Sequence, residues 1–344
     1  LRRAQAAAQE GRIDDALQAL APSTIEARGD SAIVAAEKWL SLSPADRDRT
    51  SIYASGRALR SAVNEAVQRG LKANGELGPR SGRLTVHSRV NVTHEELRYL
   101  RTYQPGMVLN FRSRDSTQKL SKGDYTVKTI DHARKQLVLE DRKGRVRQFN
   151  PARLRPGADD SRLSLFERKS LSIIEGDKIR WTDNDHKRGL FNADQARIVA
   201  IDTKGVLVET SAGKELRLSR GDPMLKRMDL AYALNAHMAQ GLTSDRGIAV
   251  MDSRERNLAN RQTFLVTVTR LRDGLTLIAD NAEKLGRAIK SNSGEKASAL
   301  EVTQRLKAAA AKGLSQDKDV GNASPASDKP ELTKERVKPF EIGI

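Results

Sequence analysis

The sequence predicts an α/β domain that is split along the chain by an all-β insertion. Three stretches of different character indicate this. Residues 1–75 have the pattern of helices around one strand, and residues 84–218 have that of short alternating strands joined by turns. Helix–strand alternation then returns after Met228. The simplest arrangement is one α/β domain formed by the first and third stretches, into which the β-rich stretch is inserted.

The first stretch predicts helices before and after a single strand. Asp30 and Ser31 can cap a helix over residues 32–40, which ends at Ser43-Pro44 and the charged residues that follow. Residues 50–54 are a short strand candidate. Apolar residues at helical spacing mark the helices on either side, at Ala4, Ala8, Ile13, Ala16 and Leu20 and at Leu59, Val63, Val67 and Leu71.

The middle stretch predicts two sets of short strands with outward Lys and Arg, as in small β-barrels. A Gly-Asp pair precedes a strand in each set, at Gly123 and at Gly176, which hints at two similar units. The predicted strands are residues 108–111, 125–130, 136–139 and 146–149 in one set, and 178–181, 196–201, 206–208 and 215–218 in the other.

The third stretch predicts a helix over residues 229–240 and a buried strand over 247–251. A helix or loop over 256–261 is followed by two apolar strands, at 264–268 and 275–278. Beyond residue 291 the composition shifts to Lys, Ala, Ser, Asp and Pro, which predicts one helix at 297–312 and otherwise a disordered tail.

Composition indicates a polyanionic partner. The 344 residues carry a net charge of +17, so nucleic acid is the first candidate and an anionic membrane the second. No apolar run approaches the roughly 20 residues of a spanning helix, so we expect no membrane contact. The chain has no cysteine, and its five histidines lack metal-ligand spacing, so we expect no metal site. Aromatic residues make up only 4%, so contacts to the nucleic-acid backbone should contribute more than stacked bases.

Two segments have the residues of a nucleotide and nucleic-acid site. In the first, His237 and Gln240 lie three apart on the predicted helix, and both can hydrogen-bond phosphate or ribose oxygens. Gly241 lets the backbone approach a ligand closely, and Thr243 follows it. In the second, Arg270 ends a predicted apolar strand. A cation there lies where α/β sheets bind ligands and can stabilise charge on a terminal phosphate.

These two segments resemble motifs V and VI of superfamily-1 helicases of the RecD-like, 5′-to-3′ branch. A third segment, from Gly176-Asp-Lys-Ile-Arg-Trp181 through Asn184 to Asn192, resembles the opening of the SH3-like insertion in that branch. Its Arg-Trp-Thr-x-Asn-Asp variant, with Asp-x-Ala-Tyr-Ala before the first segment, is similar to conjugative relaxase–helicases of the TraI/TrwC type. The resemblance covers roughly residues 1–285.

The resemblance implies a RecA-like second motor domain, split by an all-β insertion that contains an SH3-like barrel. The implied boundaries are residues 1–80 and 223–290 for the motor domain, 81–165 for a β-rich insertion, 166–222 for the SH3-like insertion and 291–344 for the tail.

The resemblance also assigns roles to individual residues. His237, Gln240 and Thr243 become DNA-binding residues, Gly241 borders the ATP γ-phosphate, and Arg270 becomes the arginine finger. Further candidates are Arg272, which would support Arg270, and Trp181, Asn184 and Asn192, which would contact DNA. For Trp181 we favour the alternative of a barrel core residue over base stacking, whereas the two asparagines are equally interpretable as turn formers.

The sequence also departs from these motifs. Ala236, Leu271 and Ala193 stand where the patterns have Thr or Ser, Ala, and Gly, and no Gly-x-x-x-x-Gly-Lys-Ser/Thr phosphate loop occurs. ATP and Mg²⁺ would therefore be bound mainly by an N-terminal RecA-like domain that precedes Leu1. Single-stranded DNA and that domain are the expected partners, with a type IV secretion coupling protein as a third, in the bacterial cytoplasm or after transfer to a recipient cell.

Two alternatives to a conjugative motor stay open. The chain could be a non-catalytic module for DNA binding and type IV secretion recognition, with vestigial motor motifs. It could also belong to a RecD-like DNA repair helicase. The sequence upstream of Leu1 would distinguish them.

Overall fold

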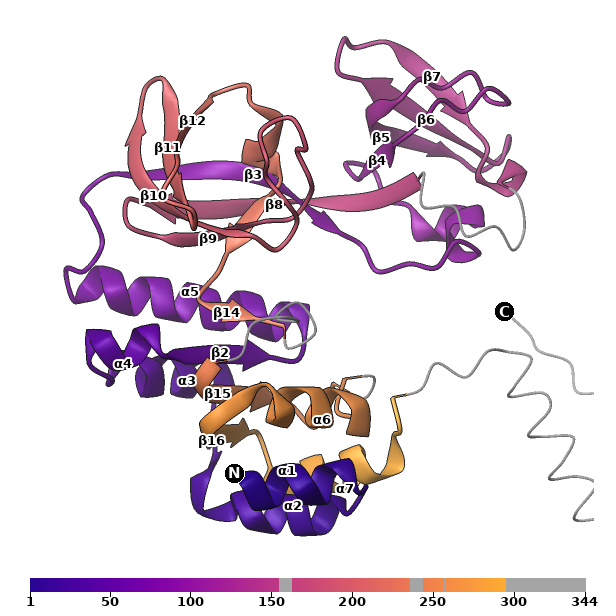
Figure 1. Cartoon of the computed structure of the whole chain (residues 1–344). Helices are drawn as coiled ribbons and strands as arrows, with labels where there is room; N and C mark the ends of the chain where they lie inside the picture. The colour runs from indigo at the N-terminus through magenta and orange to yellow at the C-terminus, as the bar shows by residue number, and fades with distance from the viewer. Residues whose placement is uncertain (155–162, 236–243, 256–257, 295–344) are drawn as a thin grey trace, which may run out of the picture. The chain divides into compact units, whose positions relative to one another are not determined.

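The computed structural model describes residues 1–154, 163–235, 244–255 and 258–294, and these residues form three sheets (Figure 1). The first sheet has five strands in the order β1-β16-β15-β2-β14, and every neighbouring pair is parallel. Its strands are β1 (Thr24–Glu26), β2 (Thr50–Ala54), β14 (Ala233–Leu234), β15 (Ser244–Met251) and β16 (Leu271–Ala279). Two strands precede the β-rich middle of the chain and three follow it, so the predicted split α/β domain is confirmed.

Helices cover both faces of this parallel sheet, which explains its nearly continuous apolar strands. On one face, α3 (Ser31–Leu40) and α5 (Arg57–Ala73) pack on alternate strand residues such as Ile52 and Ile248. On the other face, Tyr53 and Ala249 pack with four helices. These are α1 (Arg2–Gln9), α2 (Ile13–Leu20), α6 (Arg261–Thr269) and α7 (Ala282–Ser291). The sequence did not predict β1 or the short helix α4 (Pro44–Asp48), which Ser43 caps.

The second sheet is built on two long antiparallel strands. Its strands β3 (Ser81–Arg89) and β8 (Leu163–Ile174) pair along their length, and β8 also pairs with β4. The resulting six-stranded sheet has the order β3-β8-β4-β5-β6-β7. Its remaining strands are β4 (Val108–Phe111), β5 (Gly123–Asp131), β6 (Gln136–Asp141) and β7 (Val146–Phe149). We call residues 107–154, which contain β4 to β7, the first β module.

The third sheet is antiparallel, with the order β12-β11-β10-β9-β13. Its strands are β9 (Lys178–Trp181), β10 (Gln195–Asp202), β11 (Gly205–Thr210), β12 (Glu215–Ser219) and β13 (Met228–Leu230). We call residues 177–226 the second β module. Its apolar core is continuous with that of α3 and α5, whereas the first β module has a separate core.

The two β modules are copies of one structural unit, 70 residues apart. Asp115 bridges Leu120 in the first module, as Asp185 bridges Leu190 in the second. A β-bulge follows in both β5 and β10, and a Pro-initiated 3₁₀ turn closes each module. The predicted similarity is therefore confirmed, but its register was wrong. Gly176 corresponds to Gly106, with φ of 95° and 91°, and not to Gly123.

Two predicted elements after Met228 are wrong. A helix was predicted over residues 229–240, but the described part of this range contains strands β13 and β14. Strand β13 pairs with β9, and β14 pairs with β2. The strand predicted over 264–268 is helix α6, whose first turn is capped by the Asn260 side chain accepting from the Thr263 N–H. A short apolar run does not distinguish a strand from a buried helix. The helix predicted at 297–312 lies outside the described residues.

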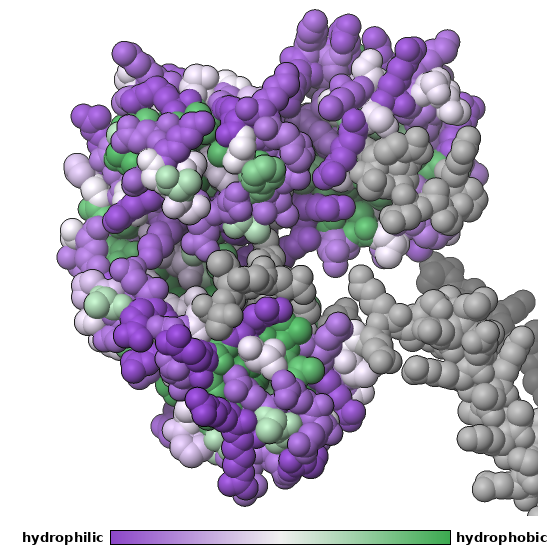
Figure 2. Space-filling view, in the orientation of Figure 1, coloured by the Kyte–Doolittle hydropathy of each residue, from purple (hydrophilic) through white to green (hydrophobic). Residues whose placement is uncertain are grey.

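No helix within the described ranges is long and apolar enough to cross a membrane. The visible face is mostly hydrophilic, with only small apolar spots (Figure 2).

Candidate nucleic-acid interface

An arginine cluster lies beside the carboxyl edge of the parallel sheet. Strand β2 ends at Ala54, and Gly56 begins helix α5 without a capping side chain, so Arg57 and Arg60 occupy the first turns of the helix. Because β14 pairs in parallel with β2, its carboxyl end lies at the same edge. This edge is where open α/β sheets bind their ligands.

The cluster has four arginines and two nearby carboxylates, Asp229 and Glu167, so its net charge is positive. Arg60 and Arg180 are 8% and 4% exposed, and both pair with Asp229, at Nη2–Oδ2 distances of 3.7 and 2.7 Å. The Nε atom of each is buried and has no hydrogen-bond partner among the described residues. Burial, followed by the charge of Arg180, lowers the pKa of Arg60. An anion beside these guanidinium groups would relieve their repulsion.

Two further arginines extend the cluster toward solvent. Arg57 is exposed at the start of α5, and Arg89 is exposed at the end of β3. Partial burial and the nearby charge of Arg89 lower the pKa of Arg57. None of the four arginines was predicted as a site residue, because they come from three separate segments. Arg57, Arg60 and Arg89 match no motif, and Arg180 stands in the Gly176–Trp181 segment but was given no role there. The only signal was the overall positive charge.

The segment from β13 to β14 is anchored by α5. The Asn64 side chain donates to the Leu230 and Ala233 carbonyls and accepts from the Ala233 N–H at 2.7 Å. Gln68, one turn later, donates to Asp177. The predicted site residues His237, Gln240, Gly241 and Thr243 follow β14 and lie outside the described residues.

Arg270 lies at the opposite, amino edge of the parallel sheet. The sequence placed it at the end of a strand, but it follows helix α6 and directly precedes β16. Its carbonyl accepts from the Ser244 N–H at 3.2 Å, so it is next to the start of β15. Its side-chain Nε is buried without a hydrogen-bond partner in the described part of the chain. The prediction that ligands would reach Arg270 at the carboxyl edge is therefore wrong.

Arg272 differs from Arg270 in being neutralised by acidic neighbours. It is 60% exposed on its side chain and pairs with Asp245 at 2.7 Å and with Asp273 at 3.0 Å. The hydrogen bonds that Arg272 donates to Asp273, followed by the charge of Asp245, raise the pKa of Arg272. Of these two arginines, Arg270 is the one whose buried Nε has no hydrogen-bond partner within the described ranges.

Trp181 is a core residue. It is 1% exposed and packs in the apolar core of the second β module, so its ring is closed to a DNA base. Asn184 and Asn192 are both exposed, and the Asn184 Oδ1 accepts from the Asn192 N–H at 2.7 Å. They therefore close one loop and present their remaining polar groups to solvent.

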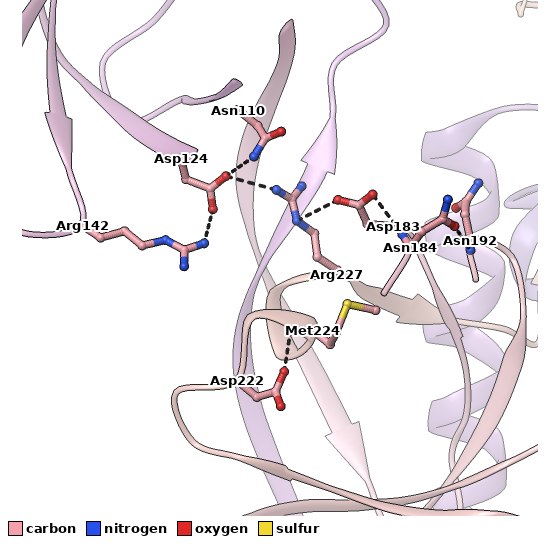
Figure 3. A network of polar contacts seen from close by, with 9 residues as sticks. All are labelled: Asn110, Asp124, Arg142, Asp183, Asn184, Asn192, Asp222, Met224 and Arg227. Atoms are coloured by element: carbon pink, nitrogen blue, oxygen red, sulfur yellow. Dashed lines mark hydrogen bonds and ion pairs between the residues drawn. The ribbon is translucent and has the colours of Figure 1, made fainter. Parts of the chain in front are cut away.

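A buried arginine joins the two β modules (Figure 3). Arg227 is 6% exposed, and its guanidinium lies 3.3 Å from Asp124 Oδ1, 3.6 Å from Asp183 Oδ2 and 4.2 Å from the Phe166 ring centre. Asp124 also accepts from Arg142 and Asn110. Burial raises the pKa of Asp124, but these partners outweigh it and leave the pKa below its usual value.

His87 makes this junction sensitive to acid. Burial, then the charge of Arg227, lowers the pKa of His87 to about 4. The unfolded chain, in which the pKa is about 6.5, therefore binds the proton more readily. Stability should fall as the pH drops from about 6.5 to 4, by up to about 3 kcal/mol.

Urea unfolding at pH 7 and pH 4.5 would measure this loss, and His87→Gln should reduce the difference between the two values. The exposed His132 provides the control, because His132→Gln should leave the difference unchanged. An unaltered pH dependence in His87→Gln would contradict the prediction.

The described residues contain no group of three His, Cys, Asp or Glu side chains that could hold a metal ion.

Comparison with known proteins gives matches to a family model, to curated relatives and to solved structures. Residues 86–173 match the family model described as the DNA relaxase TraI 2B/2B-like domain. Two curated relatives are each named multifunctional conjugation protein TraI. The one from Escherichia coli is 24% identical over 265 residues, covering 76% of this chain and 14% of the relative. The one from E. coli strain K12 is 24% identical over 263 residues, covering 75% and 14%. The chain thus spans 14% of the length of these relatives.

Solved structures of Pif1 helicases are more distant. Bacteroides Pif1 bound to single-stranded DNA has a TM-score of 0.37 at 11% identity, covering 87% of this chain and 51% of that one. Pif1 from Candida albicans has a TM-score of 0.35 at 11% identity, covering 88% and 58%.

Proposed function

We propose that this chain, a relative of the TraI-type conjugative relaxase–helicases, is the second motor half of an ATP-dependent 5′-to-3′ DNA helicase. It would bind single-stranded DNA at the carboxyl edge of its parallel sheet. It would supply Arg270, from the amino edge, to an ATP site completed by a preceding RecA-like domain. The match of residues 86–173 to a relaxase domain favours a conjugative parent protein over a repair helicase.

The observation that carries the proposal is the placement of two cationic sites at opposite edges of one sheet. The arginine cluster lies by the end of β2, and Arg270 lies by the start of β16. The chain leaves β14 at the carboxyl edge and enters β15 at the amino edge. In this proposal His237, Gln240 and Thr243 contact the DNA and Gly241 borders the nucleotide.

Arg270 fits the phosphate end of ATP. Its side chain is half-buried, and the buried Nε is a donor without a partner among the described residues, so its N–H could be donated to a γ-phosphate oxygen. Bound ATP with Mg²⁺ would supply the γ-phosphoryl group, whose transfer to water, with ADP as the leaving group, would drive the motor. Arg270 would stabilise the charge that develops on it, and Arg272 would help to hold the turn after α6.

The β modules would extend the DNA path. We assign the RecA-like motor domain to residues 1–80 and 223–290, a β-rich insertion to 81–165, an SH3-like barrel to 166–222 and a tail to 291–344. Asn184 and Asn192 would contact the strand from the second β module. A type IV secretion coupling protein is a further partner that we propose in the bacterial cytoplasm.

The DNA site predicts salt-sensitive binding in which Arg57 makes one phosphate contact. We expect the affinity of the chain for oligo-dT to fall steeply between 50 and 200 mM salt. Arg57→Gln should weaken binding several-fold and reduce the slope of log affinity against log salt by about 0.7, the value for one phosphate of a single strand. Fluorescence anisotropy titrations at several salt concentrations would measure both.

The matched control is Arg287→Gln, because this α7 side chain is 64% exposed and lies outside the cluster. It removes the same charge and should leave the slope unchanged. Equal effects of the two substitutions would show that only net charge matters, and would contradict the placement of DNA at the carboxyl edge.

A further inference from the structure

The loop between β9 and β10 has a rigid backbone. The Asp185 side chain accepts from the N–H groups of Lys187 and Arg188, and from Arg188 Nε at 2.7 Å. The guanidinium of Arg188 also binds both carboxylate oxygens of Asp222, at 2.5 and 2.9 Å. With the Asn184–Asn192 hydrogen bond, whose residues stand together in Figure 3, the loop is fastened at three points.

This loop exposes an aromatic pair. Phe191 is 45% exposed, and the His186 ring meets it edge to face, with ring centres 5.7 Å apart and an interplanar angle of 71°. Lys187, next to His186, is also exposed. An apolar ring is thus held in solvent on a fixed backbone beside a cation, whereas Trp181 of the same module is buried.

The first β module shows that the fold does not require this pair. Its corresponding loop has the same Asp115–Leu120 bridge, and the Asp115 side chain accepts from the Gln118 N–H as Asp185 does from Arg188. At the positions of His186 and Phe191 it has Ser116 and Ser121. The loop therefore forms without aromatic residues, and Phe191 is available for another role.

We propose that Phe191, supported by His186, stacks on an unpaired base of single-stranded DNA. This inference rests on the proposed function and adds a base contact to its backbone contacts. A free aromatic face accepts any base, and a fixed loop loses little conformational freedom when the base stacks. Lys187 is placed to meet the phosphate backbone of the stacked nucleotide.

The test compares oligo-dT with an abasic oligomer of equal length and charge, using the whole chain. Phe191→Ala should weaken binding to oligo-dT about tenfold, as expected for the loss of one stacked base, and leave binding to the abasic oligomer unchanged. Tyr99→Ala is the matched control, since Tyr99 is also 45% exposed but lies outside this loop. It should affect neither ligand.

A second variant reports stacking directly. Phe191→Trp should bind oligo-dT at least as tightly as the natural chain, and its fluorescence should be quenched by oligo-dT and not by the abasic oligomer. The natural Trp39 and Trp181 are buried and give a constant background.

The outcomes separate this inference from the proposed function. If Phe191→Ala weakens the affinity for both oligomers equally, or for neither, the stacking proposal is wrong. The proposed DNA-binding function would stand in either case. If the natural chain binds neither oligomer, the proposed function fails as well. If Phe191→Ala leaves DNA binding unchanged, the exposed ring would instead be assigned to a contact with another protein.

Discussion

Replacing Arg270 with alanine, in a protein that includes the preceding motor domain, should reduce ATP hydrolysis at least about 1000-fold. Binding of single-stranded DNA should change by no more than about twofold, because Arg270 and the arginine cluster lie at opposite edges of the parallel sheet. A phosphate-release assay and an anisotropy titration on the same preparation would measure the two effects. The large loss reflects a guanidinium that contributes mainly in the transition state.

Two comparisons make the result specific to Arg270. Arg270→Lys keeps the charge but not the planar, multidentate donor, and should recover little of the activity. Arg287→Ala removes an exposed arginine from α7 and should leave turnover unchanged. The isolated chain should show no ATPase activity. Normal ATP turnover in Arg270→Ala would exclude Arg270 as the arginine finger. ATP turnover by the isolated chain would exclude an ATP site shared with a second domain.

Replacing Asp177 with alanine should lower the free energy of unfolding by about 3–5 kcal/mol. Asp177 is 0% exposed and accepts three hydrogen bonds of 2.6 to 2.7 Å, from the Ile174 N–H, Gln68 Nε2 and the Tyr232 hydroxyl. Burial raises its pKa even with these donors present. Removing the carboxylate would take the acceptor from three donors, which lie in α5 (Gln68), in β8 (Ile174) and between β13 and β14 (Tyr232).

Urea unfolding at neutral pH would measure this loss. Asp194→Ala is the control in the same module, because Asp194 is exposed, and its change should stay within about 0.5 kcal/mol. A small effect of Asp177→Ala would show that the α5 contact with the second β module contributes little to stability. Gln68→Ala, which removes one donor, should cost less than Asp177→Ala and helps to separate the contributions.

The sequence by itself determined the features that depend on local pattern. Residues 50–54 and 247–251 are strands as predicted, and the helix marked by Leu59 to Leu71 forms α5. The split of the α/β domain followed from the change of apolar period after Gly75 and after Met228. The resemblance to relaxase–helicases followed from three short segments that occur in the order expected for that family. The relaxase-domain match and the curated relatives confirm this resemblance.

Other features depend on tertiary contacts that no local pattern encodes. Whether residues 264–268 form a strand or a helix was decided by the Asn260 cap and packing against α1, because five apolar residues satisfy either period. The residue-by-residue correspondence between the two β modules was predicted wrongly, because the modules share backbone geometry more than they share residue types.

The candidate site divides in the same way. The resemblance to motif VI predicted Arg270 as a site residue. Its position at the amino edge of the parallel sheet was known only from the structure. The arginine cluster draws on residues that are far apart in the sequence, from Arg57 to Arg180. They form one cluster because α5 packs beside β9 and β13. Sequence spacing records neighbours along a helix or a strand, whereas a charge cluster is formed by residues that meet only when separate elements pack together.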